Sequence, residues 1–430
     1  MKDIVKNNPK LINAWCMYDW ANSVYSLTIT TAVFPIYFLE VIKASGKEVS
    51  LLWFTVPNKV IYNYLLTIAF LSIALINPLL SGIADYSGKK KTFMKFFAWL
   101  GAFSCTMLYF FDTDTLWVGF LFSILASVGY AGSLVFYNAY LPEITTEDNF
   151  DKVSARGFSL GYAGSVILLI INLLMIEMYE TLGFKNKAEP SRISFLTVGI
   201  WWFAFSLYTF YHLPHDKKNK SDNINYLRKG YDEINNVFRK IRHHPTLKKF
   251  LLGFFFYNMA FQTIMYLATI FGSEQLNIPT SGLIITVLII QVIAIAGAYL
   301  FSISSSKLGN VKTLLLALAV SLLVCISAWF VRSEYQFYGL ACIVGIVMGG
   351  LQSLSRATYS KLIPQSNDNA SYFSFYELTD KTGTSIGIAV YGIITHATGN
   401  MKNTIFGLAA FFLLGMYLLT TLMNSKVNKT

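Results

Sequence analysis

The chain has 430 residues, of which 54% are hydrophobic, 16% are aromatic and only 13% are charged, and its formal net charge is +11. A soluble domain carries roughly 25% charged residues, so 23 acidic and 34 basic side chains are too few to cover a soluble protein of this length. The composition excludes a soluble enzyme, a fibrous protein and a disordered chain, and it indicates an integral membrane protein.

Apolar runs of about 20 residues, the length that crosses a bilayer as a helix, recur along the whole chain. They are too long and too continuous for barrel strands, which alternate over about 10 residues. We therefore predict an all-α membrane protein with twelve transmembrane helices. The expected spans are 13–39, 60–83, 92–111, 116–141, 155–179, 193–213, 248–272, 281–305, 311–331, 335–362, 372–396 and 402–424.

Most of the 34 lysine and arginine residues lie in the tails and in the loops that follow even-numbered spans. The positive-inside rule then places both termini in the cytoplasm, and we expect a multi-pass protein of the plasma (inner) membrane. Because the basic residues are spread between apolar runs, we expect no nucleic-acid partner. Histidines, cysteines and carboxylates do not cluster with metal-ligand spacing, so we expect no metal, no cofactor and no enzyme activity.

The longest polar stretch divides the chain into an N-terminal six-helix half (1–213), a basic linker (214–247) and a C-terminal six-helix half (248–430). Apolar residues recur at helical spacing in the linker, which predicts an amphipathic helix on the inner membrane surface or a simple connection between the halves. Leu141–Ile144 (LPEI) and Ile363–Ser366 (IPQS) occupy similar places in the two halves. This repeat favours two pseudo-symmetric halves.

The loop after the second span reads Ser81-Gly-Ile-Ala-Asp85-Tyr-Ser-Gly88-Lys89-Lys90-Lys91. It resembles the signature of the major facilitator superfamily between its second and third spans. The resemblance implies gate and structural roles for Asp85, Gly88, Lys89 and Lys90, with Asp85 capping a helix and bonding basic residues across the half interface. The corresponding loop of the second half keeps Gly309 but has Ser306 at the aspartate position.

Two further blocks are more specific. The first span contains Trp15-Cys-Met-Tyr18-Asp19-Trp20-Ala21-Asn22-Ser23-Val-Tyr25, and Gln352-Ser-Leu-Ser355-Arg356 is followed by Tyr372-Phe-Ser-Phe-Tyr376-Glu377-Leu-Thr379-Asp380-Lys381. These blocks resemble the bacterial family related to the vacuolar amino-acid effluxer of fungal autophagy. The resemblance implies a multi-pass secondary transporter of the major facilitator fold, with amino-acid efflux as its expected activity.

A carboxylate such as Asp19 inside a membrane span is costly, so it must face a partner or a wet cavity. The tenth and eleventh spans place charged residues at a similar depth, which predicts a charge cluster. We expect the transport or coupling residues to be Asp19, Asn22, Arg356, Glu377, Asp380 and Lys381. The cluster has three interpretations: a gate held by salt bridges, a relay for protons or a substrate carboxylate, or a static part of the fold.

The resemblance to the major facilitator superfamily implies a central cavity lined by the first, fourth, seventh and tenth spans, and the polar stripes on these spans fit that arrangement. Its expected lining residues are Trp15, Tyr18, Tyr25, Tyr137, Asn138, Asn258, Gln262, Tyr266, Gln352 and Tyr376. Amide and tyrosine side chains suit a neutral or zwitterionic solute better than a phosphate, which calls for several arginines. Glycines at 157, 161, 164, 383 and 387 are expected to allow close packing at the half interface.

The chain is thus predicted to move a small polar solute, in exchange with or together with protons, by alternating access as a monomer in the lipid bilayer. One alternative is a transporter of an amphiphilic, drug-like or lipid-like solute. Another is a transport-inactive membrane receptor or scaffold that recruits partners through its basic linker.

Overall fold

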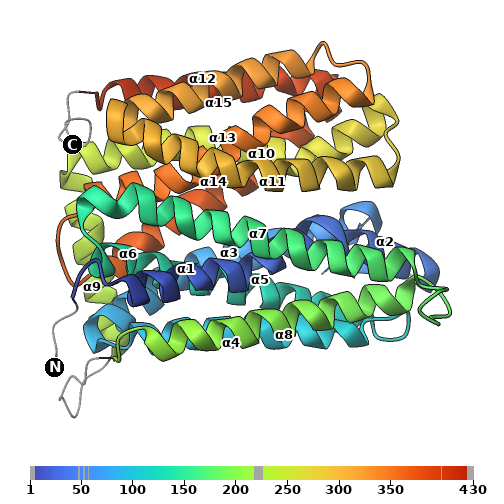
Figure 1. The fold of residues 1–430 in the computed structure, drawn as a ribbon, viewed down its shortest axis with the longest axis horizontal. Helices are drawn as coiled ribbons and strands as arrows, with labels where there is room; N and C mark the ends of the chain where they lie inside the picture. Colours follow the sequence, from blue (N-terminus) through green and yellow to red (C-terminus); the bar gives the residue numbers. More distant parts are fainter. Residues whose placement is uncertain are drawn as a thin grey trace.

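The computed structural model describes residues 5–46, 49–51, 54–56, 58–216, 226–398 and 400–423. Its architecture is a bundle of long helices, as predicted (Figure 1). The first group of elements comprises α1 (Pro9–Val24), the π-helix η1 (Tyr25–Ala32), α2 (Phe34–Ser45), α3 (Asn58–Ser87), α4 (Lys90–Met107), η2 (Leu108–Phe110), α5 (Leu116–Ala139), α6 (Leu141–Ile144), η3 (Glu147–Asn149), α7 (Phe150–Glu177) and α8 (Ala188–His212).

The second group begins after the polar stretch. It comprises α9 (Tyr226–His243), α10 (Pro245–Leu276), α11 (Thr280–Leu308), α12 (Asn310–Ala328), α13 (Glu334–Leu362), α14 (Asn369–Thr398), η4 (Met401–Asn403) and α15 (Thr404–Thr420). One antiparallel hairpin of β1 (Val49–Leu51) and β2 (Phe54–Val56) lies in the loop expected between the first two spans. The sequence analysis did not anticipate this hairpin.

Within the described residues, nine helices are long and apolar enough to cross a membrane, and two bent helix pairs raise the number to eleven. The remaining long helix, α14, carries Glu377, Asp380 and Lys381. In chain order these helices correspond to the expected spans. The first span is bent by 43° between η1 and α2, at the position where Pro35 enters the first turn of α2; proline is tolerated there because it needs no backbone partner.

Figure 1 shows the helices in two layers, with α1, α3, α4, α5 and α8 in one and α10 to α15 in the other. Contacts between the layers are made chiefly by α7 with α11 and α13, and by α14 with α3 and α5. The start of α1, the end of α15 and the crossing helix α9 lie at the same end of the bundle, which we call the α9 end (Figure 1).

Four of the five glycines expected at the half interface pack within their own layer, whereas Gly157 lies beside Arg356 of the other layer. A Cβ atom at Gly161 would lie 2.4 Å from Ser23 Oγ, so this glycine lets α7 approach α1. A Cβ atom at Gly387 would lie 2.2 Å from Thr263 Oγ1 of α10. The expectation was wrong for this pair because the small faces of α7 and α14 turn toward helices of their own layer.

Helix α9 crosses α3 at a contact between two glycines. A Cβ atom at Gly82 would lie 2.4 Å from the carbonyl oxygen of Gly230. The same helix reaches the second layer, because Lys240 Nζ lies 3.1 Å from Asp368 Oδ2 and the ring of Phe238 lies 5.9 Å from that of Phe375. The linker helix therefore contacts both layers at the α9 end.

Candidate functional site

A buried ion pair joins the two layers, between Asp19 in the second half of α1 and Arg356 in the last third of α13. Arg356 Nη1 lies 3.2 Å from Asp19 Oδ2, and the two residues are only 2% and 4% exposed. Arg356 also donates from Nε to Ser154 Oγ at 2.9 Å and from Nη2 to the Ser154 carbonyl at 2.9 Å. Asp19 accepts a further hydrogen bond from the Tyr137 hydroxyl at 2.7 Å.

Aromatic rings enclose the guanidinium of Arg356. Its Cζ lies 4.8 Å from the ring centroid of Trp15 and 4.1 Å from that of Phe158. Such cation–π contacts are favourable for a desolvated arginine. Gly157 leaves the space for this pair, because a Cβ atom there would lie 2.5 Å from Asp19 Oδ2.

The ion pair continues into a second group of charges on α14. Asn138 connects the two, since its Oδ1 accepts from Arg356 Nη1 at 3.3 Å and its Nδ2 donates to Glu377 Oε1 at 3.0 Å. Glu377 Oε2 has no hydrogen-bond partner among the residues that the structure describes, and it lies 3.9 Å from Lys381 Nζ.

The chain of contacts continues from Glu377 to Lys381, then to Asp380, and ends at Asn258. Lys381 Nζ lies 2.6 Å from Asp380 Oδ2, although the sequence analysis did not require these neighbours to pair. Asp380 in turn accepts from Asn258 Nδ2 of α10 at 2.5 Å. The structure thus brings the predicted charge cluster together in one connected set, which we call the central charge network: Asp19, Asn138, Asn258, Arg356, Glu377, Asp380 and Lys381.

The predicted cavity-lining residues lie in different surroundings. Tyr18 is fully buried inside the first layer, with its ring 5.1 Å from Tyr137, and Tyr25 bonds Ser127 Oγ at 2.7 Å. Gln352 crosses the layers, since its Oε1 accepts from the Tyr162 hydroxyl at 2.6 Å. Gln262 and Tyr266 are partly exposed on α10, whereas the side-chain nitrogen of Asn22 is buried without a partner.

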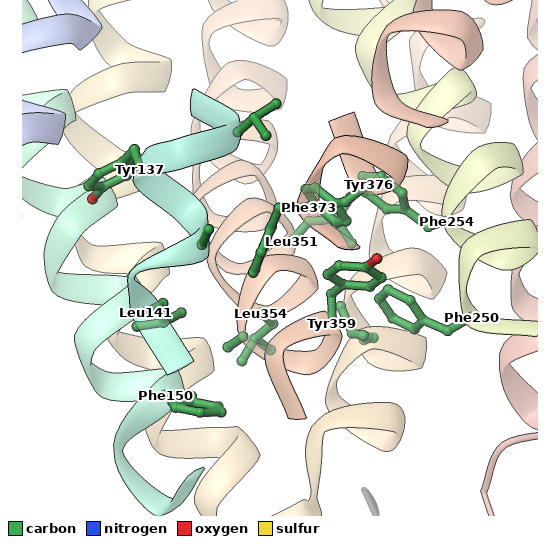
Figure 2. Close-up of a cluster of buried hydrophobic side chains, with 14 of the residues drawn as sticks. Tyr137, Leu141, Phe150, Phe250, Phe254, Leu351, Leu354, Tyr359, Phe373 and Tyr376 are labelled. Atoms are coloured by element: carbon green, nitrogen blue, oxygen red, sulfur yellow. The ribbon is translucent and has the colours of Figure 1, made fainter. Parts of the chain in front are cut away.

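Tyr376 belongs to an aromatic cluster of the second layer. Its ring stacks on Phe254 with a centroid distance of 4.4 Å and lies 5.0 Å from Tyr359. Figure 2 shows Tyr376, Tyr359, Phe250 and Phe254 on one side of α13, with Tyr137 on the opposite side. Tyr376 therefore packs inside its own layer.

Asp85 links the layers at the α9 end. Its carboxylate accepts from the backbone N–H of Ser371 at 2.7 Å and of Ala370 at 3.3 Å, in the first turn of α14. Asp85 therefore caps a helix, as predicted, but its hydrogen-bond donors are backbone amides and not the basic side chains that were also expected. Lys90 instead pairs with Glu143, and Asn369 Nδ2 donates to the same carboxylate at 3.0 Å. We call this group the first latch.

The neighbouring motif residues shape the corner. Gly88 has φ of +66°, a conformation that suits glycine, and it separates α3 from α4. Lys89 lies with its Nζ 5.9 Å from the ring centroid of Tyr226.

A second latch was not predicted. Asp151, at the start of α7, accepts from Lys361 Nζ at 3.1 Å, Asn310 Nδ2 at 2.7 Å and Ser305 Oγ at 2.8 Å. It ties α7 to the corner between α11 and α12 and to the end of α13. Lys361 follows Arg356 by five positions and lies two positions before the second repeat block. This place in the sequence was the signal that could have identified it.

Known proteins resemble this chain over most of its length. Residues 7–430 match the family described as "Vacuole effluxer Atg22 like". The chain is 31% identical over 418 residues to the MFS-type transporter YxiO of Bacillus subtilis (strain 168), covering 97% of this chain and 95% of that protein. It is 25% identical over 399 residues to Autophagy-related protein 22 of Kluyveromyces lactis, covering 84% of this chain and 77% of that protein.

Solved structures show the same fold. The major facilitator superfamily transporter FucP, in its outward conformation, matches with a TM-score of 0.71 at 13% identity, covering 96% of this chain and 98% of FucP. The human organic anion transporter MFSD10 matches with a TM-score of 0.71 at 13% identity, covering 96% of this chain and all of that chain. The chain therefore belongs to the Atg22-like vacuole effluxer family, and its family and fold are those of MFS-type transporters and not of enzymes.

Proposed function

We propose that this transporter exports a small polar solute of the amino-acid class, coupled to protons, by alternating access between two six-helix halves (1–213 and 248–430) joined by the linker 214–247. In this proposal the protein spans the plasma membrane, and its α9 end lies on the cytoplasmic side. The family membership supports solute efflux, and the excess of basic residues near the α9 end supports the orientation.

The observation that carries proton coupling is the charge balance of the central charge network. It holds two cations, Arg356 and Lys381, and three carboxylates, those of Asp19, Glu377 and Asp380. With two cations and three carboxylates, the network has one excess negative charge, and an uncompensated charge buried at membrane depth has a high free-energy cost. One bound proton removes this excess charge. Glu377 is the favoured carrier, because one of its oxygens has no hydrogen-bond partner.

The same network explains how the proton is coupled to movement. Asn138 bonds both Arg356 and Glu377, so a change of charge on Glu377 acts on the contact that joins α5 to α13 and α14. Opening at the α9 end would require the Arg356–Asp19 pair to separate, and this costs several kcal/mol unless water or solute replaces the lost partners. A solute with both an ammonium and a carboxylate group offers such replacements.

The test uses the purified full chain in proteoliposomes with a pH gradient and labelled neutral amino acids. Asp19→Asn and Glu377→Gln should each lower proton-driven flux by at least about tenfold, the effect of a loss of about 1.4 kcal/mol, while expression stays normal. Asp112→Asn is the matched control, because Asp112 pairs with Arg192 within the first layer and its side chain is 49% exposed.

Wild-type flux in Asp19→Asn would remove Asp19 from the mechanism. If the Arg356–Asp19 pair is a gate, exchanging the two charges in one protein should restore part of the flux that either single change removes. Deletion cells should accumulate labelled amino acids, and unchanged pools would assign the transporter to another solute.

A further inference from the structure

A groove of about 1600 Å³ lies at the α9 end between α4, α8 and the start of α9, and none of its lining residues belongs to the central charge network. Its lining combines basic and aromatic side chains. The lining residues are Ser87, Lys89, Lys91, Thr92, Lys95, Trp99, Leu207, Tyr208, Phe210, Tyr211, His212, His215, Asp216 and Tyr226. Of these lining residues, only Lys89 was expected to have a role in the loop motif, and its ammonium lies 5.9 Å from the ring centroid of Tyr226.

The positive charge of the groove is only partly used by the protein. Lys91 donates to the Leu213 carbonyl at 2.6 Å. The carboxylate of Asp216 is occupied by the first turn of α4, since it accepts from the backbone N–H of Lys91 at 2.8 Å and of Thr92 at 3.0 Å. Lys95 has no carboxylate partner among the described residues. The groove therefore presents cations without a matching anion.

Aromatic rings hold Lys95 at the rim of an apolar surface. Its Nζ lies 5.8 Å from the ring centroid of Trp99 and 5.7 Å from that of Phe210. Beyond Trp99, which is 41% exposed, the outer face of α4 continues with exposed Phe103. Tryptophan and lysine side chains lie close together in this way where a transmembrane helix passes from the hydrocarbon core into the headgroup region.

The second half lacks this arrangement at the corresponding place. Gly88 and Gly309 both have positive φ and stand at the equivalent corners. Counting from these glycines, Lys95 and Trp99 correspond to Leu316 and Val320. The basic and aromatic groove is therefore a feature of the first half and not a general consequence of the fold.

We propose that this groove binds the headgroup of an anionic phospholipid from the leaflet at the α9 end. The phosphate lies near Lys95 and Lys89, and the acyl chains follow the exposed aromatic face of α4. Charge complementarity and the continuity of the groove with a lipid-facing apolar surface favour a membrane lipid over a free anion.

The test measures lipid retention by native mass spectrometry and thermal stability of the full chain after exchange into phosphatidylcholine nanodiscs with or without phosphatidylglycerol. The variant is Lys89→Gln/Lys95→Gln. The matched control is Lys307→Gln/Lys312→Gln, which removes the same charge from two exposed lysines at the corresponding corner of the second half. Inorganic phosphate is tested separately as the free anion.

Wild type and control should retain phosphatidylglycerol and gain thermal stability from it. The groove variant should retain it about 30-fold less well, which follows from a loss of about fivefold (about 1 kcal/mol) for each lysine near the surface, while its stability in phosphatidylcholine alone stays at the wild-type value. Equal retention by both variants, or an equal gain from inorganic phosphate, would overturn the proposal. Retention lost together with stability in phosphatidylcholine would overturn it as well, because the lysines would then act on folding.

Discussion

At the α9 end, the corner of each half is linked to the opposite layer through a carboxylate. In the first half the corner supplies the carboxylate, whereas in the second half the corner supplies the hydrogen-bond donors. In the first half, Asp85 belongs to the corner and accepts from backbone amides of α14. In the second half, the corner supplies the donors Asn310 and Ser305, and the carboxylate is Asp151 of α7. The contact between the layers can be made with the carboxylate on the corner or on the helix that it meets. The presence of the aspartate motif at one corner therefore does not show whether the other corner contacts the opposite layer.

The two latches differ in what surrounds the carboxylate. In the first latch, Asp85 binds neutral amides at a helix start, where a capping side chain contributes about 0.5–2 kcal/mol, and the neighbouring Lys90–Glu143 pair has side chains that are 11% and 24% exposed. The second contains an ion pair whose lysine and aspartate side chains are 5% and 9% exposed. Removing one partner of a buried pair costs about 3–5 kcal/mol, so the second latch is expected to be the more sensitive one.

The largest effect is expected from Asp151→Ala. It leaves the ammonium of Lys361 buried without a carboxylate and should lower the free energy of unfolding by about 3–5 kcal/mol. Thermal unfolding in detergent measures this loss. Asp148→Ala, at an exposed position close by in η3, is the control. Adding Lys361→Met should recover part of the stability, and equal behaviour of the two alanine variants would contradict a buried ion pair.

A smaller effect is expected from Asp85→Asn. The amide keeps an oxygen for the N–H groups of α14 but loses the negative charge that favours a helix N-terminus. The loss of about 1 kcal/mol should open the α9 end about fivefold more often. Labelling of Ser371→Cys by a water-soluble maleimide measures this opening, with Asp148→Asn as the charge-matched control. An unchanged labelling rate would show that Asp85 does not hold this end closed.

The smallest effect is expected from Ser306→Asp, which restores the carboxylate of the signature to the second corner. Ser306 is exposed and bonds the Ile303 carbonyl of its own helix at 2.7 Å. The stability should change by less than about 0.5 kcal/mol. In the Asp151→Ala background the same change should give no rescue. Rescue there would show that the second corner can supply its own carboxylate.

Hydropathy and motifs alone determined the fold class of this protein and the order of its long helices along the chain. A span needs about 20 apolar residues in succession, and this property is local, so the helices could be placed from the sequence. The free-energy cost of a charged side chain inside the membrane also depends on the position of that residue along its span. It singled out Asp19, Arg356 and Glu377 as members of one cluster before any distance was known.

The tertiary structure alone decided which side chains contact one another across different helices. Which side chains meet depends on how each helix is rotated and which helix lies next to it, and neither quantity is encoded in a single segment. This is why Asp151 replaces a missing carboxylate of the second corner, why Gly161 faces α1 and not the other layer, and why Asn138 reaches both Arg356 and Glu377.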